Sequence, residues 1–387
     1  MCRLLTLFFI LAIPCTLFAA PPIIPAPPQL AAQGYLLIDA ATGTVLVEHN
    51  SKQRLPPASL TKIMTSFVAA SEIERGTASL KDSVNVSVKA WRMEGSRMFI
   101  QESTRVLVQD LLRGIVVQSG NDASVALAEH LAGSEEAFVN IMNQQASRLG
   151  MVDTNFANST GLPDENHYTT ASDLARLTVA LIEKYPEHYK LYSEKYFTYN
   201  NIRQPNRNSL LWRDNTVDGV KTGHTDAAGY CLIASAVRDG MRLVSVVMGT
   251  QSEEARSTES QKLMTYGFRY FETVSLYSGN ETLKKVRVWG GSHSSINVGL
   301  VNDVVVTIGR GARDSLAAHM DITNEIYAPL SEGQELGILS VKMNEEVLLS
   351  PKLVALNAVE QAGFFSRAWD EIELFFLKLF DGDPLEI

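Results

Sequence analysis

The sequence predicts an α+β fold, in which an antiparallel sheet faces a helical block and is followed by a small all-β domain and a C-terminal amphipathic helix. From about residue 59 to residue 185 apolar residues recur mostly at helical spacing, and after about residue 274 that period is lost until the last segment. Apolar strand patterns flank the helical stretch, at 34–39, 44–48, 217–222, 229–237 and 243–248. A sheet closed by the first and last strands would face the helices.

The N-terminus has the pattern of a secretory signal peptide. Arg3 precedes a long apolar run, and the small residue Ala19 follows it. The run ends at Pro21 and is shorter than the about 20 apolar residues that a membrane span needs, which favours a cleaved signal over an anchor. We therefore expect a signal peptide at 1–19 and a proline-rich tether at 20–33.

Cysteine content, charge and histidine spacing exclude several classes of protein. Cleavage after Ala19 would leave Cys231 as the remaining cysteine, so no disulfide framework is expected. The formal net charge of -9 argues against a nucleic-acid partner, because phosphate binding needs a basic surface. The seven histidines are scattered and glycine-rich phosphate loops are missing, so we expect no metal or other cofactor.

The helical block begins at Ser59, just after two prolines, and Ile63, Met64 and Phe67 give its first helix an apolar face that ends before Gly76. Further helical patterns follow at 108–117, 122–132, 135–149 and 172–184. With the strands on either side, this block would belong to one domain at 34–274.

A second, all-β domain is expected at 275–361. Short strand patterns at 285–288, 304–308 and 336–341 are separated by Gly, Asn and Asp turns. Because no helical spacing interrupts them, these strands would build a core of their own.

The last segment, 362–387, is predicted to be an amphipathic helix with a wide apolar stripe. The stripe consists of Phe364, Phe365, Ala368, Trp369, Ile372, Phe375, Phe376 and Leu379. The helix either packs on its own domain or lies in a membrane surface, and the aromatic residues along the stripe favour the membrane. Its polar face carries Asp370, Glu371, Glu373 and Asp381 against Arg367 and Lys378, so apolar burial would have to drive binding.

Three short motifs carry the candidate chemistry: Ser59-Leu60-Thr61-Lys62, Ser119-Gly120-Asn121 and Lys221-Thr222-Gly223. Singly they are weak, because Ser-x-Asn also occurs at 83–85, 278–280 and 295–297. The first of these copies has a strand pattern, and we expect turns at the other two. Order, spacing and local structure together make the motifs informative.

Ser59 and Lys62 would share one face of the first helical turn. A serine hydroxyl becomes a nucleophile when a neighbour takes its proton, and a lysine whose pKa is lowered by burial and nearby positive charge can do so. The helix N-terminus and the Ser59 backbone N–H would help to hold an oxyanion. Taken alone, this motif fits a capping serine beside a solvated lysine better than a catalytic pair.

Ser119 and Asn121 fall between two predicted helices, where side chains can project into a cleft. Ser119 would relay a proton to a leaving amine. Asn121 would bind the substrate amide or orient Lys62. The alternative for both residues is an N-cap without any chemistry.

Lys221 ends a predicted strand and would supply charge for a carboxylate while lowering the pKa of Lys62. Gly223 would let the backbone approach a bound ligand closely. Thr222 and His224 would complete the carboxylate pocket and provide a second oxyanion donor.

Arg207 is a second candidate for the carboxylate. Separately, Lys221 and Arg207 are more often solvated cations, and His224 is more often a turn residue.

These motifs resemble those of the penicillin-recognising serine enzymes, with their β-lactamase/transpeptidase-like fold. The closer match is to low-molecular-mass penicillin-binding proteins, the serine-type D-alanyl-D-alanine carboxypeptidases of the DacA type. The similar stretches are PASLTKIM at 57–64, SGNDA at 119–123, NSTGL at 158–162 and DGVKTGHT at 218–225. The likeness covers about 34–250 and extends to the β domain and terminal helix.

The resemblance implies that Ser59 is acylated, that Lys62 is the base, that the second motif lines the cleft, and that Lys221 with His224 holds a terminal carboxylate. It implies peptidoglycan stem peptides ending in D-Ala-D-Ala as substrates and β-lactam antibiotics as ligands. The protein would then lie on the periplasmic side of the bacterial inner membrane, held at the membrane surface by its terminal helix.

Other functions on the same fold are a β-lactamase, a D,D-endopeptidase and a non-catalytic penicillin-binding scaffold. Class A β-lactamases activate water with a Glu-x-x-Leu-Asn loop, which LPDEN at 162–166 does not match, so slow release of penicillin is expected. Intact Ser59, Lys62 and Lys221 argue against a scaffold.

Overall fold

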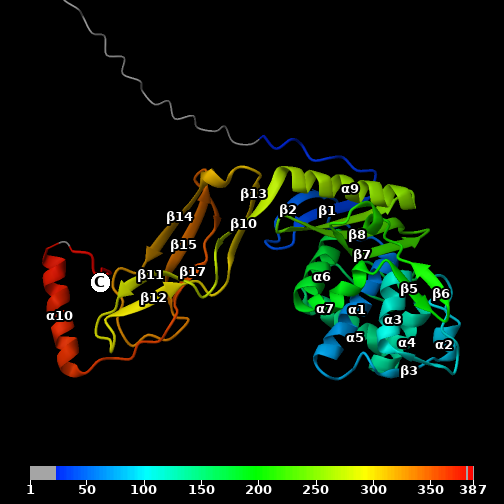
Figure 1. The fold of residues 1–387 in the computed structure, drawn as a ribbon, viewed down its shortest axis with the longest axis horizontal. Coiled ribbons are helices and arrows are strands. Elements are labelled where there is room, and N and C mark those ends of the chain that lie inside the picture. Colours follow the sequence, from blue (N-terminus) through cyan, green and yellow to red (C-terminus); the bar gives the residue numbers. More distant parts are fainter. Residues whose placement is uncertain (1–22, 381, 387) are drawn as a thin grey trace, which may run out of the picture.

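The computed structural model describes residues 23–380 and 382–386, so the expected signal peptide lies outside the described residues. A five-stranded antiparallel sheet forms the first domain, with the strand order β2-β1-β9-β8-β7 (Figure 1). Its strands are β1 (Gly34–Asp39), β2 (Val45–His49), β7 (Val217–Thr225), β8 (Gly229–Arg238) and β9 (Met241–Thr250). Because β1 pairs with β9, the first and last strands lie side by side, as predicted.

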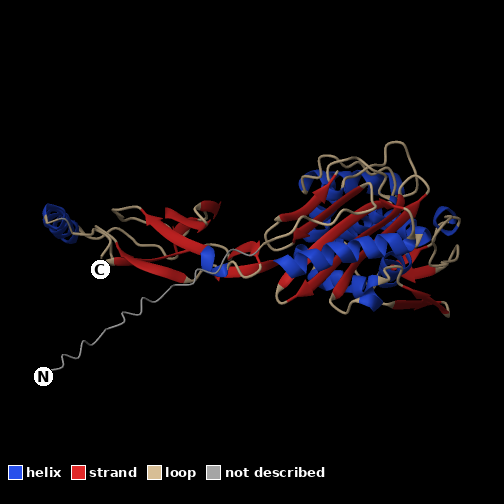
Figure 2. Ribbon diagram, turned by 90° about the horizontal axis from the view of Figure 1, so that it is seen from above, coloured by secondary structure: helices blue, strands red, loops and turns tan. Residues whose placement is uncertain are grey.

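Helices cover both faces of this sheet (Figure 2). The helices are α1 (Lys62–Glu74), α2 (Val88–Trp91), α3 (Val108–Arg113), α4 (Asn121–Ala132), α5 (Glu135–Arg148), α6 (Ala171–Lys184), α7 (Pro186–Tyr189), α8 (Leu210–Arg213) and α9 (Glu253–Tyr270). Small ribbons add β3 (Ser83–Asn85), β4 (Arg105–Leu107), β5 (Tyr196–Tyr199) and β6 (Ile202–Pro205).

Side chains along β8 point alternately to the two faces of the sheet, and apolar residues on both faces need to be buried by helices. Cys231 and Ile233 belong to the core shared with α1 and α6, whereas Leu232 and Ala234 belong to the core under α9. Burial raises the pKa of the Cys231 thiol to about 11, so this cysteine behaves as an inert core residue.

Three local predictions were wrong. The helix expected at 108–117 is interrupted, since a turn of π-helix at Gly114–Gln118 follows α3. Ser59 lies in a 3₁₀ turn, Ala58–Thr61, that precedes α1 instead of within an α-helix. The turn expected at 295–297 is the start of strand β12, because Ile296 enters the core of the β domain.

The strands from β10 to β17, at 271–355, fold into an all-β unit with its own apolar core. A ribbon of β10 (Phe271–Tyr277) and β13 (Val304–Gly309) continues directly from α9. The main sheet has the order β11-β12-β17-β15-β14, with β16 paired to β15. Its strands are β11 (Thr282–Arg287), β12 (Ser295–Gly299), β14 (Leu316–Ile322), β15 (Glu335–Met343), β16 (Glu346–Leu349) and β17 (Lys352–Ala355).

Asp39 joins the two domains. This carboxylate is fully buried at the end of β1 and accepts hydrogen bonds from the hydroxyls of Thr273, at 2.6 Å, and Thr307, at 2.7 Å. It also accepts from the backbone N–H of Ala41 at 2.9 Å. Since Thr273 lies on β10 and Thr307 on β13, one buried charge fixes the ribbon against the first sheet.

The terminal helix α10 (Phe364–Leu379) contacts the β domain with its polar side. Asp370 accepts a hydrogen bond from the Gly290 N–H at 2.8 Å, and Arg287 forms ion pairs with Asp370, at 3.5 Å, and Glu373, at 3.0 Å. Lys378 pairs with Glu325 at 2.6 Å. Asp370 and Glu373 on this face therefore bind the β domain.

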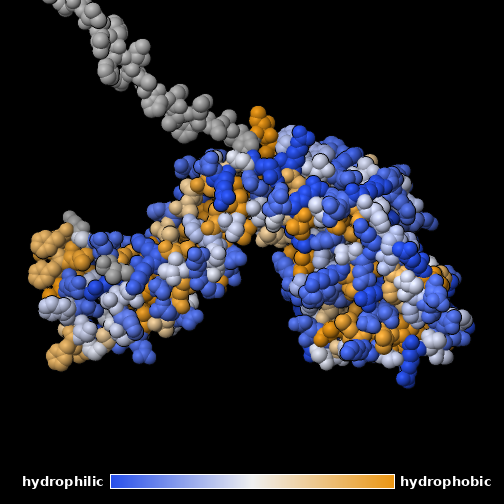
Figure 3. All heavy atoms as spheres, viewed as in Figure 1, coloured by the Kyte–Doolittle hydropathy of each residue, from blue (hydrophilic) through white to orange (hydrophobic). Residues whose placement is uncertain are grey.

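The apolar stripe of α10 faces solvent (Figure 3). Phe365 is 88% exposed and Trp369 69%, whereas Leu374 on the docked side is 5% exposed. Among the residues that the structure describes, no helix is both long enough and apolar enough to cross a membrane.

We predict that Asp39→Ala lowers the free energy of unfolding by about 2 to 4 kcal/mol, because buried donors lose a charged acceptor. Urea denaturation of the variant and of Asp314→Ala, an exposed aspartate of the β domain, measures the effect. A variant within about 0.5 kcal/mol of wild type would show that Asp39 does not hold the joint.

Candidate active site

Ser59 lies in the 3₁₀ turn at the head of α1, half-buried at the wall of a cleft. Lys62 is the first residue of α1, and its Nζ atom is 3.0 Å from Ser59 Oγ. The three-residue spacing of Ser59 and Lys62 therefore brings the hydroxyl and the amine within hydrogen-bonding distance, as predicted.

Lys62 is fully buried and has two further partners. Its Nζ is 2.7 Å from Asn121 Oδ1 and 2.5 Å from the carbonyl oxygen of Thr160. Burial, and then the positive charge of Arg207, lower the pKa of Lys62 to about 7. A neutral amine can donate its two N–H groups to Asn121 and Thr160, which leaves its lone pair for the Ser59 hydroxyl.

Two other basic groups act on Lys62. Arg207 lowers its pKa, and Lys221, the cation that we expected, also repels Lys62, because the repulsion between two positive charges is mutual. The pKa of Lys221 is itself held well below its usual range, mainly by burial and also by the charges of Lys62, Arg207 and Arg256. The four cations share one region, and an anionic ligand would relieve their mutual repulsion.

Ser119 sits in the left-handed conformation, with φ of 66°, between the π-helical turn and α4. It is 2% exposed, and its Oγ has no hydrogen-bond partner among the described residues. Asn121 donates from Nδ2 to the Glu94 carbonyl at 2.6 Å and accepts from Lys62, so it orients the lysine. Neither residue caps α4, whose N-cap is Gly120.

Strand β7 forms the opposite wall. Thr222 faces the cleft, and the Lys221 amine beneath the surface donates to the Thr222 carbonyl at 3.1 Å. His224 lines the cleft and stacks on Tyr230, with ring centroids 3.9 Å apart.

Gly223 also lets two distant parts of the chain pack closely together. A Cβ atom there would lie 3.1 Å from the Pro57 carbonyl oxygen and 3.3 Å from Ala58 Cβ. The absence of a side chain thus lets β7 pack against the turn that carries Ser59, and Gly223 also lines the cleft.

Arg256 is a site residue that the sequence did not reveal. It lies on the first turns of α9, is 4% exposed, and its Nε has no partner among the described residues. Its terminal nitrogens contact the Gly223 carbonyl and Glu253, both at 3.4 Å. No motif surrounds it, and its place in the cleft depends on how α9 crosses the sheet.

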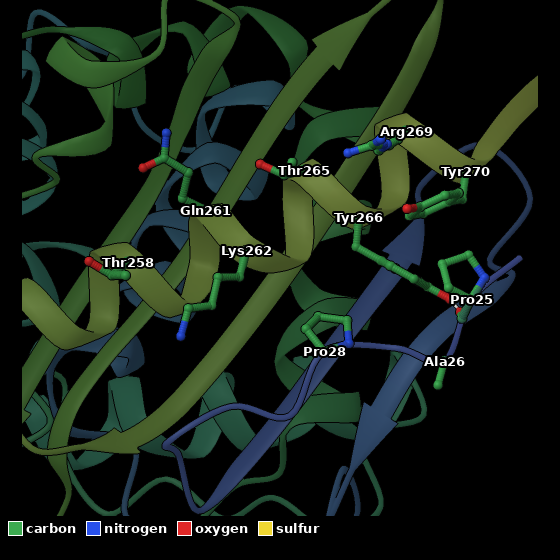
Figure 4. A pocket seen from close by; sticks show the side chains of 10 residues that line it. All are labelled: Pro25, Ala26, Pro28, Thr258, Gln261, Lys262, Thr265, Tyr266, Arg269 and Tyr270. Carbon is green, nitrogen blue, oxygen red and sulfur yellow. Dashed lines mark hydrogen bonds between the residues drawn. The ribbon is translucent and has the colours of Figure 1, made fainter.

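The cleft has a volume of about 450 Å³ and contains most of the predicted site residues. Its lining includes Ser59, Ser119, Asn121, Arg207, Thr222, Gly223, His224 and Arg256. A second cavity of similar volume lies between α9 and the tether, where Tyr266 donates to the Pro25 carbonyl at 2.9 Å (Figure 4). That cavity holds none of the motif residues.

Comparisons with known proteins agree with this geometry. One family model, D-alanyl-D-alanine carboxypeptidase, matches residues 22–252, and another, penicillin-binding protein 5, C-terminal domain, matches residues 271–361. The chain is 43% identical to the D-alanyl-D-alanine carboxypeptidase DacC of Escherichia coli, over 94% of this chain and 93% of that protein.

Solved structures show the same fold. Penicillin-binding protein 5 from Haemophilus influenzae matches with a TM-score of 0.82 and 41% identity, over 87% of this chain and 99% of that chain. Ampicillin-bound penicillin-binding protein D2 from Listeria monocytogenes matches with a TM-score of 0.58 and 31% identity, over 63% of this chain and all of that one (100%). The predicted fold class is confirmed.

We predict that the rate of acylation by a fluorescent penicillin rises with pH through about 7, as Lys62 loses its proton. In Arg207→Gln the midpoint should move to higher pH, because removal of a nearby positive charge raises the pKa of Lys62. Arg203→Gln, which removes an arginine held over the Tyr196 ring, is the matched control. A midpoint that stays in place or moves to lower pH in Arg207→Gln would contradict this assignment.

Proposed function

The chain belongs to the D-alanyl-D-alanine carboxypeptidase family, and from that premise we propose that it removes the terminal D-alanine of peptidoglycan stem pentapeptides through an acyl-enzyme on Ser59. The observation that carries the proposal is the buried Lys62 amine, 3.0 Å from Ser59 Oγ, with a pKa of about 7. Such an amine is a base at neutral pH and an acid one step later.

In the acylation step, Ser59 Oγ attacks the carbonyl carbon of the penultimate D-alanine and passes its proton to neutral Lys62. The backbone N–H groups of Ser59 and His224 would hold the oxyanion. When the C–N bond breaks, the leaving amine takes a proton from Lys62 through the Ser119 hydroxyl. The Oγ of Ser119 has no partner within the described part of the chain, which supports this relay, since the group can accept one proton and donate another.

Water then attacks the ester carbonyl carbon and passes a proton to Lys62. The bond between the acyl carbon and Ser59 Oγ breaks, and Oγ takes that proton from Lys62. The second product is the shortened peptide with a new carboxylate. A β-lactam follows the same first step, because its strained amide presents a carbonyl to Ser59 while its ring nitrogen stays attached. The mismatch of 162–166 to the water-activating loop of class A β-lactamases supports slow deacylation.

The terminal carboxylate of the substrate would bind among Lys221, Arg207 and Arg256, with Thr222 as a hydroxyl donor. Lys221 is 2% exposed, Arg256 is 4% exposed, and the Arg256 Nε has no partner among the described residues. An arriving carboxylate would pair with these cations and favour the charged form of Lys221.

Carboxypeptidase activity is favoured over the related alternatives. A relative that covers both the first domain and the β domain carries the name carboxypeptidase. The intact pair of Ser59 and Lys62, within hydrogen-bonding distance, argues against a non-catalytic scaffold. A cross-linked peptide dimer offered beside the pentapeptide distinguishes an endopeptidase by its products.

We also propose that α10 lies in the outer surface of the bacterial inner membrane and holds the protein on the periplasmic side. Exposed aromatic residues, including Phe365 and Trp369, support insertion at the headgroup level. Asp370 and Glu373 are paired with Arg287, which reduces the repulsion between this face and anionic lipids.

We predict that Ser59→Ala abolishes both D-alanine release from a D-Ala-D-Ala pentapeptide and the single penicilloyl adduct seen by mass spectrometry, because the hydroxyl forms the ester. Ser83→Ala, in a Ser-x-Asn copy on β3, should keep both. D-alanine release by wild type without any adduct would refute the acyl-enzyme.

We predict that Phe365→Ser, Trp369→Ser and Phe376→Ser, combined in one variant, release the protein from neutral phosphatidylcholine vesicles, because the apolar stripe supplies the binding energy. Co-sedimentation measures the bound fraction, and Glu371→Ser on the polar face is the control. Equal sedimentation of the triple variant and wild type would refute the anchor.

A further inference from the structure

The turn that carries Ser59 depends on an unusual backbone conformation at Ala58. This residue has φ of 47°, in the left-handed region that residues with a Cβ seldom adopt. Ala58 is 1% exposed and precedes the nucleophile directly. Such a conformation persists only where surrounding contacts hold it in place.

Two buried side chains hold this turn. The hydroxyl of Thr61 donates to the Ala58 carbonyl at 2.8 Å, and the same oxygen lies 2.9 Å from His167 Nε2. Because the single hydroxyl proton points to Ala58, the Nε2–H of His167 must donate to Thr61. Thr61 and His167 are 0% and 4% exposed, so water does not compete for these bonds.

Contacts around His167 fix its position and leave Nε2 as the ring nitrogen that binds Thr61. Its backbone N–H donates to the Asp164 carbonyl at 3.0 Å, and its ring packs edge-on against Phe156. Nδ1 is buried with no partner among the described residues, which favours the neutral ring. Burial lowers the pKa of His167 to about 4, in agreement with a ring that stays neutral and donates from Nε2 alone.

The loop that ends at His167 approaches the turn at two other points. The Thr160 carbonyl accepts from Lys62, and Gly161, with φ of 86°, has no Cβ that would overlap the Ala58 carbonyl. One loop therefore contacts the base, the strained residue and the threonine that supports it. The chain of bonds from His167 through Thr61 to Ala58 reaches the residue before the nucleophile, and none of these three residues lines the cleft.

We propose that His167 is a positioning residue for acylation: by donating to Thr61 it holds the left-handed turn at Ala58 that sets Ser59 Oγ against Lys62. This inference rests on the proposed acyl-enzyme function. His167 takes no proton in the reaction, and its contribution is the placement of the attacking oxygen, where a displacement of about 1 Å can cost about 100-fold in rate.

The test compares His167→Leu, which removes the donor at similar volume, with His167→Gln, which can supply an N–H to Thr61. The saturating rate constant for acylation by a fluorescent penicillin should fall about 10- to 100-fold in His167→Leu. It should stay within about 3-fold of wild type in His167→Gln. Thr61→Val should be as slow as His167→Leu, and the double variant His167→Leu/Thr61→Val no slower than either single variant, because both break the same chain.

Thermal unfolding of each variant separates positioning from stability. The proposal fails if His167→Leu acylates at the wild-type rate, or if His167→Gln is as slow as His167→Leu. It also fails if the rate losses of the two single variants multiply in the double variant. If His167→Leu does not fold, the comparison of His167→Gln with Thr61→Val decides, and equally slow acylation by both variants refutes the proposal. Absence of any adduct in wild type would instead refute the acyl-enzyme, so the two failures are distinguishable.

Discussion

Burial of the Lys62 amine is the constraint on which the site depends. Moving an ammonium group out of water is costly, and the protein meets this by letting the group lose its proton near neutral pH. Separate segments then supply its partners, namely the turn with Ser59, the start of α4 with Asn121 and the loop with Thr160. A fold that joins these segments rigidly produces a base and a nucleophile at the same point.

The sheet and its neighbours were predictable because their signals are local. Strand β8 carries apolar residues on both faces, and the short motifs occur in the order that one cleft requires. The left-handed turn at Ala58 gave no signal, since glycine or asparagine usually marks this conformation and a residue with a Cβ seldom adopts it. Arg256 gave none either, because tertiary packing of α9 brings it to the cleft. The true neighbour of Gly223 is a turn more than a hundred residues away, which no spacing rule reveals.

The joint between the two domains and the turn at the active site are held in a similar way. At the joint, the buried carboxylate of Asp39 binds two threonines of the β10–β13 ribbon. At the site, His167 and Thr61 hold a single carbonyl. In both places a short chain of buried hydrogen bonds links two elements. Such chains are specific because a partly satisfied network is costly.

The docking of α10 bears on where the enzyme works. The helix lies at the opposite end of the molecule from the first domain, and its ion pairs with Arg287 prevent it from rolling about its own axis (Figure 1). If the stripe enters lipid as proposed, the β domain becomes a spacer of constant height. As the protein diffuses along the membrane, its cleft would then reach stem peptides in one thin layer of the cell wall. Stem peptides nearer to or farther from the lipid would keep their terminal D-alanine.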